Sequence, residues 1–413
     1  MEPNPSTTMT STTVTLPRGR NLSLDRVAFG LLLAFVALLQ FSIAAAQIVL
    51  TPTLLCWAAI LVRRHERPMA PHFFLPLVAY AGWTLVATFF SFNFGISIVD
   101  DKQLVLFLIV PAVYELARGE RASTVIDVLI SAGAASAAIG IIQYGVLHYN
   151  NLHQRPQGAL THYMTYSGIL MLVIAVAAAK LIFGNRDRTW PALVMPALVV
   201  ALAITFGRSA WVGACAAVGL LLVLRNFRLI VLLPVLVALM FAFAPDRINA
   251  RMVSMFDMQD PTVRDRMAMV RTGIAIIRDQ PLTGIGPDMV PHKYAEFRDP
   301  SAVQATNPHL HNVPLQIAAE RGLPAVAIWT WFVGVLVAGL WRLFRAGPSR
   351  MLAAGSLAVV AGMLAAGMTE YNFGDSEFLM LFLVVVTLPF AAARDPLVPT
   401  GPSGSRQPAR VAS

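Results

Sequence analysis

The chain has 413 residues, of which 57% are hydrophobic and only 13% are charged, and its mean hydropathy is +0.65. A soluble protein of this length has no core large enough to bury so much apolar surface, so the composition indicates a protein that lies mostly in lipid. The formal net charge of +9 does not indicate nucleic-acid binding, because the basic residues form short clusters between apolar runs. The two cysteines, Cys56 and Cys215, lie in apolar stretches and predict neither a disulfide framework nor a cysteine metal site.

Apolar segments recur along the chain at lengths close to the ~20 residues that cross a bilayer. We therefore predict an all-α polytopic membrane protein with about twelve transmembrane helices, the first of them uncleaved. The predicted segments are 27–41, 43–62, 73–91, 103–117, 122–147, 163–183, 190–206, 209–224, 229–244, 323–341, 351–369 and 376–393.

The arginine clusters between these segments orient the chain. With a cytoplasmic N-terminus, all of them fall on the cytoplasmic side, as the positive-inside rule requires. The clusters are Arg63/Arg64/Arg67, Arg118/Arg121, Arg186/Arg188, Arg225/Arg228 and Arg342/Arg345/Arg350. The predicted organisation is a disordered cytoplasmic N-terminus (1–26), nine helices (27–244), a large outer loop (245–322), three helices (323–393) and a disordered cytoplasmic tail (394–413).

This orientation places Arg155 and Arg208 in short outer loops, where basic residues oppose the insertion bias. One interpretation is that each side chain reaches to phospholipid phosphates. The other is that both face a shared cavity and bind an anionic ligand through bidentate hydrogen bonds.

The large outer loop contains a predicted amphipathic helix. Asp260 and Pro261 are typical of a helix start, and Asp279 and Pro281 end the pattern. The apolar positions in between recur at helical spacing: Val263, Met267, Val270, Ile274 and Ile277. Three arginines spaced by seven, Arg264, Arg271 and Arg278, are interpreted as contacts to lipid headgroups, whereas Arg266 lies on the other flank of the apolar stripe.

Two further motifs follow this helix. The turn sequence 281–287 contains glycines that either allow a close backbone approach or reverse the chain. His309, His311 and Asn312 then precede the next apolar run. The histidines are candidates for metal ligands, for a general base or for capping residues. Metal binding needs a third partner, and no HExxH or comparable cluster stands nearby.

Four motifs in this order resemble those of the O-antigen ligase and O-antigen polymerase family of bacterial membrane glycosyltransferases. The resemblance covers roughly residues 27–393, and it departs from the family at Val270, where most relatives have tryptophan. The motifs are Arg155-Pro156-Gln157-Gly158, Gly207-Arg208-Ser209-Ala210-Trp211, Arg266 with 279–286, and His309-Leu310-His311-Asn312 with Leu315 and 320–324.

The resemblance implies a GT-C-like fold in the inner membrane of a Gram-negative bacterium, with a periplasmic active site in loop 245–322. It implies transfer of a glycan from undecaprenyl pyrophosphate to lipid A-core oligosaccharide during lipopolysaccharide assembly. Such a transfer needs a base for the acceptor hydroxyl and cations for the departing pyrophosphate. The outer loops hold no DxD motif but are rich in arginine, so we expect neither metal nor cofactor.

The residues available for this chemistry suggest specific roles. We expect His311 to be the general base and Arg208 and Arg266 to bind the pyrophosphate, in a single displacement that inverts the anomeric centre. Arg155 is a candidate to assist the phosphates, and His309 and Asn312 are candidates to support His311, although ordinary loop polarity explains them equally well. Five outward carboxylates could contact sugar hydroxyls or could simply be solvated: Asp100, Asp101, Glu370, Asp375 and Glu377.

Three alternatives stay open. An O-antigen polymerase and a protein O-oligosaccharyltransferase share the donor, the fold and the motifs, and differ only in the acceptor. A secondary transporter also has about twelve spans, but transporters place ionisable residues at mid-membrane, whereas here the candidate charges lie toward one face.

Overall fold

The computed structural model describes residues 24–394 except 186, 244 and 348. The predicted tails, 1–26 and 394–413, therefore lie almost entirely outside the described residues. The described part of the chain is all-helical and contains no β-strand, which confirms the all-α prediction there.

Six of the described helices are long and apolar enough to cross a membrane. They are α2 (Ile43–Arg64), α6 (Arg121–Gly145), α7 (Tyr163–Phe183), α9 (Arg208–Arg225), α14 (Val313–Ala346) and α15 (Arg350–Gly367). Shorter apolar helices include α3 (Phe74–Phe89), α8 (Thr189–Ile204) and α16 (Ser376–Ala392), and η2 (Phe227–Val231) continues into α10 (Leu232–Phe243). These helices support a polytopic membrane protein, and the count of about twelve spans stays a prediction.

The predicted segment 103–117 is not one regular helix. After α4 (Phe94–Asp100), the chain runs as the tighter 3-10 helix η1 (Asp101–Leu108), and α5 (Ile109–Leu116) starts just before Pro111. Proline has no N–H and is tolerated in the first turn of a helix, so this residue fits the start of α5 better than the middle of a longer helix.

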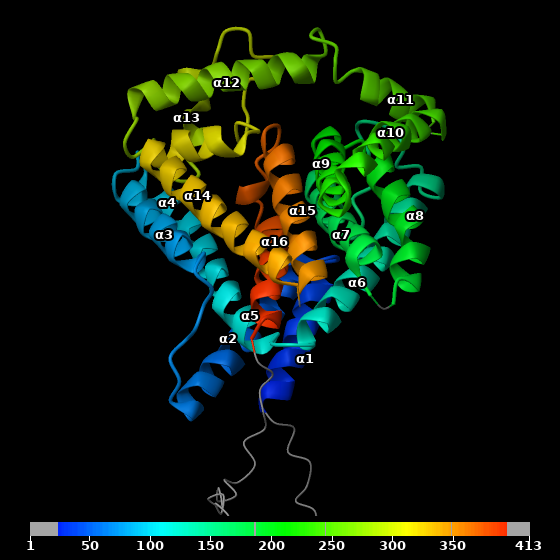
Figure 1. The fold of residues 1–413 in the computed structure, drawn as a ribbon. Coiled ribbons are helices and arrows are strands. Elements are labelled where there is room, and N and C mark those ends of the chain that lie inside the picture. The colour runs from blue at the N-terminus through cyan, green and yellow to red at the C-terminus, as the bar shows by residue number, and fades with distance from the viewer. Residues whose placement is uncertain (1–23, 186, 244, 348, 395–413) are drawn as a thin grey trace, which may run out of the picture.

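The helices form a bundle with one end covered by the outer loop (Figure 1). α15 packs against α9, α7 and α14, and it also contacts α16. Most side chains of α7 and α16 are buried, so these two helices form part of the bundle interior. At the covered end, α12 (Pro261–Asp279) crosses the bundle, with α11 (Asp246–Val253) and α13 (Val290–Phe297) beside it (Figure 1).

Charged residues connect the end of α2 with the start of α6. Asp25 of α1 (Leu24–Leu38) accepts a 2.6 Å hydrogen bond from Arg121 and lies 4.0 Å from Arg64. The predicted arginine clusters at the ends of 43–62 and 103–117 are therefore neighbours in space.

The glycine turn after α12 inserts into a kink in α14. The amides of Ile285 and Gly286 donate to the carbonyls of Ala319 and Glu320, each at 2.9 Å. Gly284 (φ +66°) and Gly322 (φ +78°) have left-handed backbones, and a Cβ on Gly322 would lie 1.9 Å from the carbonyl oxygen of Leu282. The glycines thus allow a close backbone approach, which fixes the C-terminal end of α12 against α14.

Candidate active site

The loop before α14 is anchored to the end of α15. Asn312 caps α14: its side-chain oxygen accepts from the Leu315 amide at 2.9 Å, and its amide nitrogen donates to the Met368 carbonyl at 3.0 Å. His311 lies directly before this cap with φ +48°, a left-handed conformation that is uncommon for a residue other than glycine. Asn312 therefore has a local structural role, and it holds His311 next to the segment that carries Glu370.

His311 and Glu370 form a hydrogen-bonded pair that the outer-loop motifs did not predict. The Nδ1 of His311 lies 3.1 Å from both carboxylate oxygens of Glu370, and the two side chains are only 14% and 13% exposed. An ionised carboxylate can only accept hydrogen bonds, so Nδ1 carries the proton. This tautomer leaves Nε2 of the neutral ring as an acceptor, as a general base requires.

His309 lies beside this pair. Its ring centroid is 4.2 Å from that of His311, with the planes at 72°, and its Nε2 is 3.9 Å from Glu370. Burial raises the pKa of Glu370, but the hydrogen bond from His311 and the nearby positive charge, which includes that of Arg266, outweigh it and lower this pKa to about 2. Burial and the charge of His311 lower the pKa of His309 to about 4, so His309 is neutral at pH 7.

The same three side chains could hold a metal ion. One ligand atom each from His309, His311 and Glu370 lies within 4.8 Å of the others. Reasoning from the sequence found no third ligand near the histidines, because Glu370 comes from a segment beyond α15. The absence of a metal from the reaction stays a prediction.

Arg208 and Arg266 line a common cavity of about 270 Å³, which we call the arginine cavity. Arg208 is the first residue of α9, and Arg266 lies on α12. The other lining residues are Val212, Met255, Val263, Met267, Val270 and Thr369. Two cations beside apolar side chains suit a lipid that carries phosphate groups.

Arg208 is buried, and one nitrogen of its guanidinium makes no hydrogen bond within the described part of the chain. Its Nη1 donates to the carbonyl and the hydroxyl of Ser254, each at 3.2 Å. Its Nη2 lies 3.6 Å from Asp260 and has no hydrogen-bond partner among the described residues. The hydrogen-bonding capacity of this guanidinium is therefore only partly used by the described residues.

Arg251 joins this group, although reasoning from the sequence did not single it out. Its Nη1 lies 3.8 Å from Asp260, so Asp260 is a shared counter-ion for Arg208 and Arg251. Burial and the charges of Arg208 and Arg155 lower the pKa of Arg251 to about 10. Asp260 also caps α12 through the amides of Thr262 and Val263, as its position before Pro261 predicts.

Arg155 lies close enough to Arg208 to feel its charge, but it does not line the arginine cavity. Its guanidinium stacks 4.2 Å from the ring centre of Tyr163, and its Nε donates to the Leu152 carbonyl at 3.0 Å. Burial is the main reason why its pKa is lowered.

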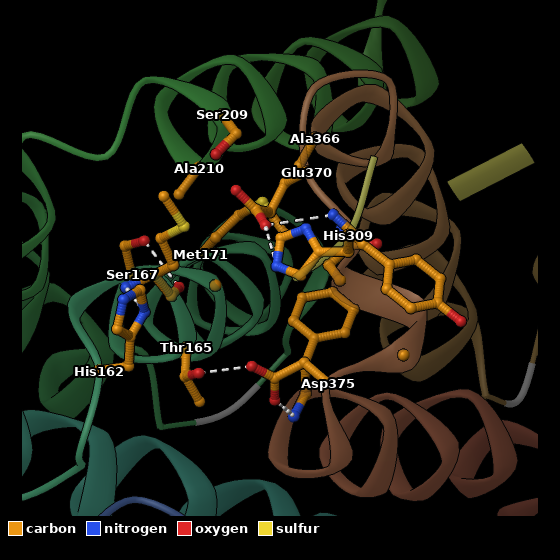
Figure 2. A pocket seen from close by; sticks show the side chains of 16 residues that line it. His162, Thr165, Ser167, Met171, Ser209, Ala210, His309, Ala366, Glu370 and Asp375 are labelled. Atoms are coloured by element: carbon orange, nitrogen blue, oxygen red, sulfur yellow. Dashed lines mark hydrogen bonds and ion pairs between the residues drawn. The ribbon is translucent and has the colours of Figure 1, made fainter. Parts of the chain in front are cut away.

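Glu370 lines a second cavity, of about 330 Å³. Figure 2 shows Thr165 and Asp375 hydrogen-bonded at one side of it, and Ser209, Ala210 and Glu370 toward the other. His162, His309 and Phe378 also line it. We call it the carboxylate cavity, because Glu370 and Asp375 are its charged lining residues.

Other predicted positions have different surroundings. Asp100 accepts a 3.2 Å bond from Arg321, which also donates to Glu320 at 2.8 Å, so Asp100 belongs to a separate buried charge network. Arg271, predicted to contact lipid headgroups, pairs with Asp299 at 2.9 Å within the outer loop.

Comparison with known proteins agrees with the motifs. No curated protein matches the chain. Residues 192–330, roughly a third of the chain, match the family described as O-Antigen ligase. The matched region contains Arg208, Arg266, His309 and His311, whereas Arg155 and Glu370 lie outside it. The resemblance of this chain to the O-antigen ligase family is thus confirmed. Together with the long apolar helices, the match supports the conclusion that the chain is a membrane protein with a function of the O-antigen ligase or polymerase type.

Proposed function

We propose that the protein is an inverting glycosyltransferase that moves O-antigen glycan from undecaprenyl pyrophosphate to lipid A-core oligosaccharide without a metal ion. The proposal includes about twelve spans in the Gram-negative inner membrane and a site at the periplasmic face. The observation that carries it is that Glu370, the partner of His311, directly follows Thr369, which lines the cavity of Arg208 and Arg266.

The proposed step is one displacement. As the acceptor hydroxyl attacks C1 of the donor sugar, Nε2 of His311 takes its proton, and Glu370 stabilises the resulting imidazolium. The bond between C1 and the pyrophosphate oxygen breaks, and its electron pair leaves with the pyrophosphate. Arg208 and Arg266 stabilise the charge that develops there. Pyrophosphate is a good leaving group, so no general acid is needed.

Two features of the chain support the lipid-linked donor. The arginine cavity combines guanidinium groups with exposed apolar side chains, including Met267 and Val270 of α12. Such a surface can contact both the phosphates and the first part of a polyprenyl chain. The candidate charges lie toward one end of the apolar helices, which fits a site at the membrane face better than a mid-membrane transport site.

A lipopolysaccharide gel of a deletion strain distinguishes the acceptors. Loss of the whole ladder with lipid A-core intact supports the ligase, and a single-repeat band indicates a polymerase. An unchanged ladder indicates protein glycosylation or transport. Complementation with wild-type protein must restore the ladder.

Purified variants test the assigned roles. His311→Ala should abolish transfer while donor binding survives. Arg208→Lys and Arg266→Lys should each weaken donor binding about 10-fold or more, because a lysine cannot reproduce the bidentate fork of a guanidinium. Arg271→Lys is the matched control, because Arg271 is an exposed arginine of α12, the helix that carries Arg266. Full ligation by His311→Ala would eliminate the assignment of the base.

A further inference from the structure

The two cavities are neighbours, because consecutive residues of the chain line one and the other at two places. Arg208 lines the arginine cavity, and the next residue, Ser209, lines the carboxylate cavity. Likewise, Thr369 lines the arginine cavity, and the next residue, Glu370, lines the carboxylate cavity. The two cavities therefore have neighbouring walls, and Glu370, which holds His311, and His309 line the carboxylate cavity.

The cavities differ in charge. The charged residues lining the carboxylate cavity are Glu370 and Asp375, and neither Lys nor Arg lines it. Carboxylates repel phosphate groups but accept hydrogen bonds from hydroxyls. The volume of about 330 Å³ lies in the range of small-molecule sites. The carboxylate cavity thus fits a neutral sugar and disfavours the pyrophosphate that the arginine cavity suits.

Thr165 and Asp375 form a rigid polar wall for such a sugar. Thr165, in the first turn of α7, donates to one oxygen of Asp375, and the other oxygen caps α16 by accepting from the Phe378 amide at 3.0 Å. Each carboxylate oxygen keeps a lone pair that a sugar hydroxyl can use.

We propose that the carboxylate cavity binds the sugar of the acceptor that carries the attacking hydroxyl, with Thr165 and Asp375 as its positioning residues. This inference rests on the proposed function. In a single displacement, the nucleophile and the leaving group lie on opposite sides of C1. Because the leaving pyrophosphate belongs in the arginine cavity, the acceptor belongs in the carboxylate cavity, which His309 and Glu370 also line.

Binding measurements on the full-length protein in detergent test this without relying on turnover. Thr165→Val removes only the hydroxyl, and Asp375→Asn keeps an oxygen to cap α16. Each should weaken binding of lipid A-core about 10-fold and leave binding of the lipid-pyrophosphate donor unchanged. Thr330→Val is the matched control, because its hydroxyl bonds only to the Val326 carbonyl of its own helix. Equal thermal midpoints exclude a general loss of fold.

The outcomes separate the two proposals. Unchanged lipid A-core binding in both variants overturns the acceptor subsite. Weaker donor binding also overturns it, because the cavity then holds the donor sugar. A wild-type protein that transfers no glycan from the donor contradicts the proposed function, and the lipid A-core binding constants still decide about the subsite.

Discussion

Glu370 lies 3.1 Å from the imidazole of His311, although 59 residues separate them in the chain. His311 precedes α14 and Glu370 follows α15, so the packing of these two helices brings the pair together. The carboxylate holds the proton on Nδ1 and turns Nε2 into the acceptor. The pair is therefore the arrangement on which the proposed base depends.

Glu370→Gln tests this arrangement. A glutamine amide can donate to Nδ1 and so stabilise the tautomer that is protonated on Nε2, which cannot accept the substrate proton. We expect glycan transfer to fall about 100-fold or more, the usual range for losing general-base catalysis, while donor binding stays unchanged. Glu296→Gln, at an exposed position of α13, is the control. Wild-type transfer by Glu370→Gln would remove Glu370 from the mechanism.

Metal removal tests the role of the arginines. The cluster of His309, His311 and Glu370 has ligand atoms close enough for a metal ion, yet the positive charge of Arg266 already acts on Glu370. We expect EDTA-treated protein to keep its full rate of glycan transfer. A loss of activity that only Mg²⁺ or Mn²⁺ restored would show that guanidinium groups do not replace the metal.

Local signals predicted the outer-loop helix well. Asp260 and Pro261 start α12, and Asp279 ends it, because caps and apolar periodicity act between neighbouring residues. The partner of His311 could not be chosen in this way. Glu370 was one of five outward carboxylates, and only the packing of α15 against α14 selects it. The shared ion pair of Asp260 with Arg208 and Arg251 likewise depends on tertiary structure.

Asp260→Asn tests that shared ion pair. Asparagine keeps the cap on α12 but leaves Arg208 and Arg251 to repel each other in a buried site. We expect the ligand-free protein to lose about 1–2 kcal/mol of stability, and inorganic pyrophosphate to raise its thermal midpoint by more than in wild type.

Asp257→Asn provides the control for this change, because Asp257 is exposed and caps only the neighbouring turn through the Gln259 amide. A thermal midpoint of Asp260→Asn equal to that of wild type, with an equal response to pyrophosphate, would show that Asp260 does not compensate the arginines.

The stability of the folded protein should depend on pH through His309. Its pKa is about 4 in the folded protein against an ordinary value of 6.5, so the unfolded chain binds more protons between these values. The contribution of His309 to the free energy of unfolding is fully present above pH 6.5. It falls by roughly 2–3 kcal/mol as the pH falls toward 4. His309→Gln should therefore flatten the decline of the thermal midpoint between pH 6.5 and 4, whereas a substitution of the exposed His153 by glutamine should leave that decline in place. Identical pH profiles for wild type and His309→Gln would mean that His309 is not held neutral by its burial beside His311.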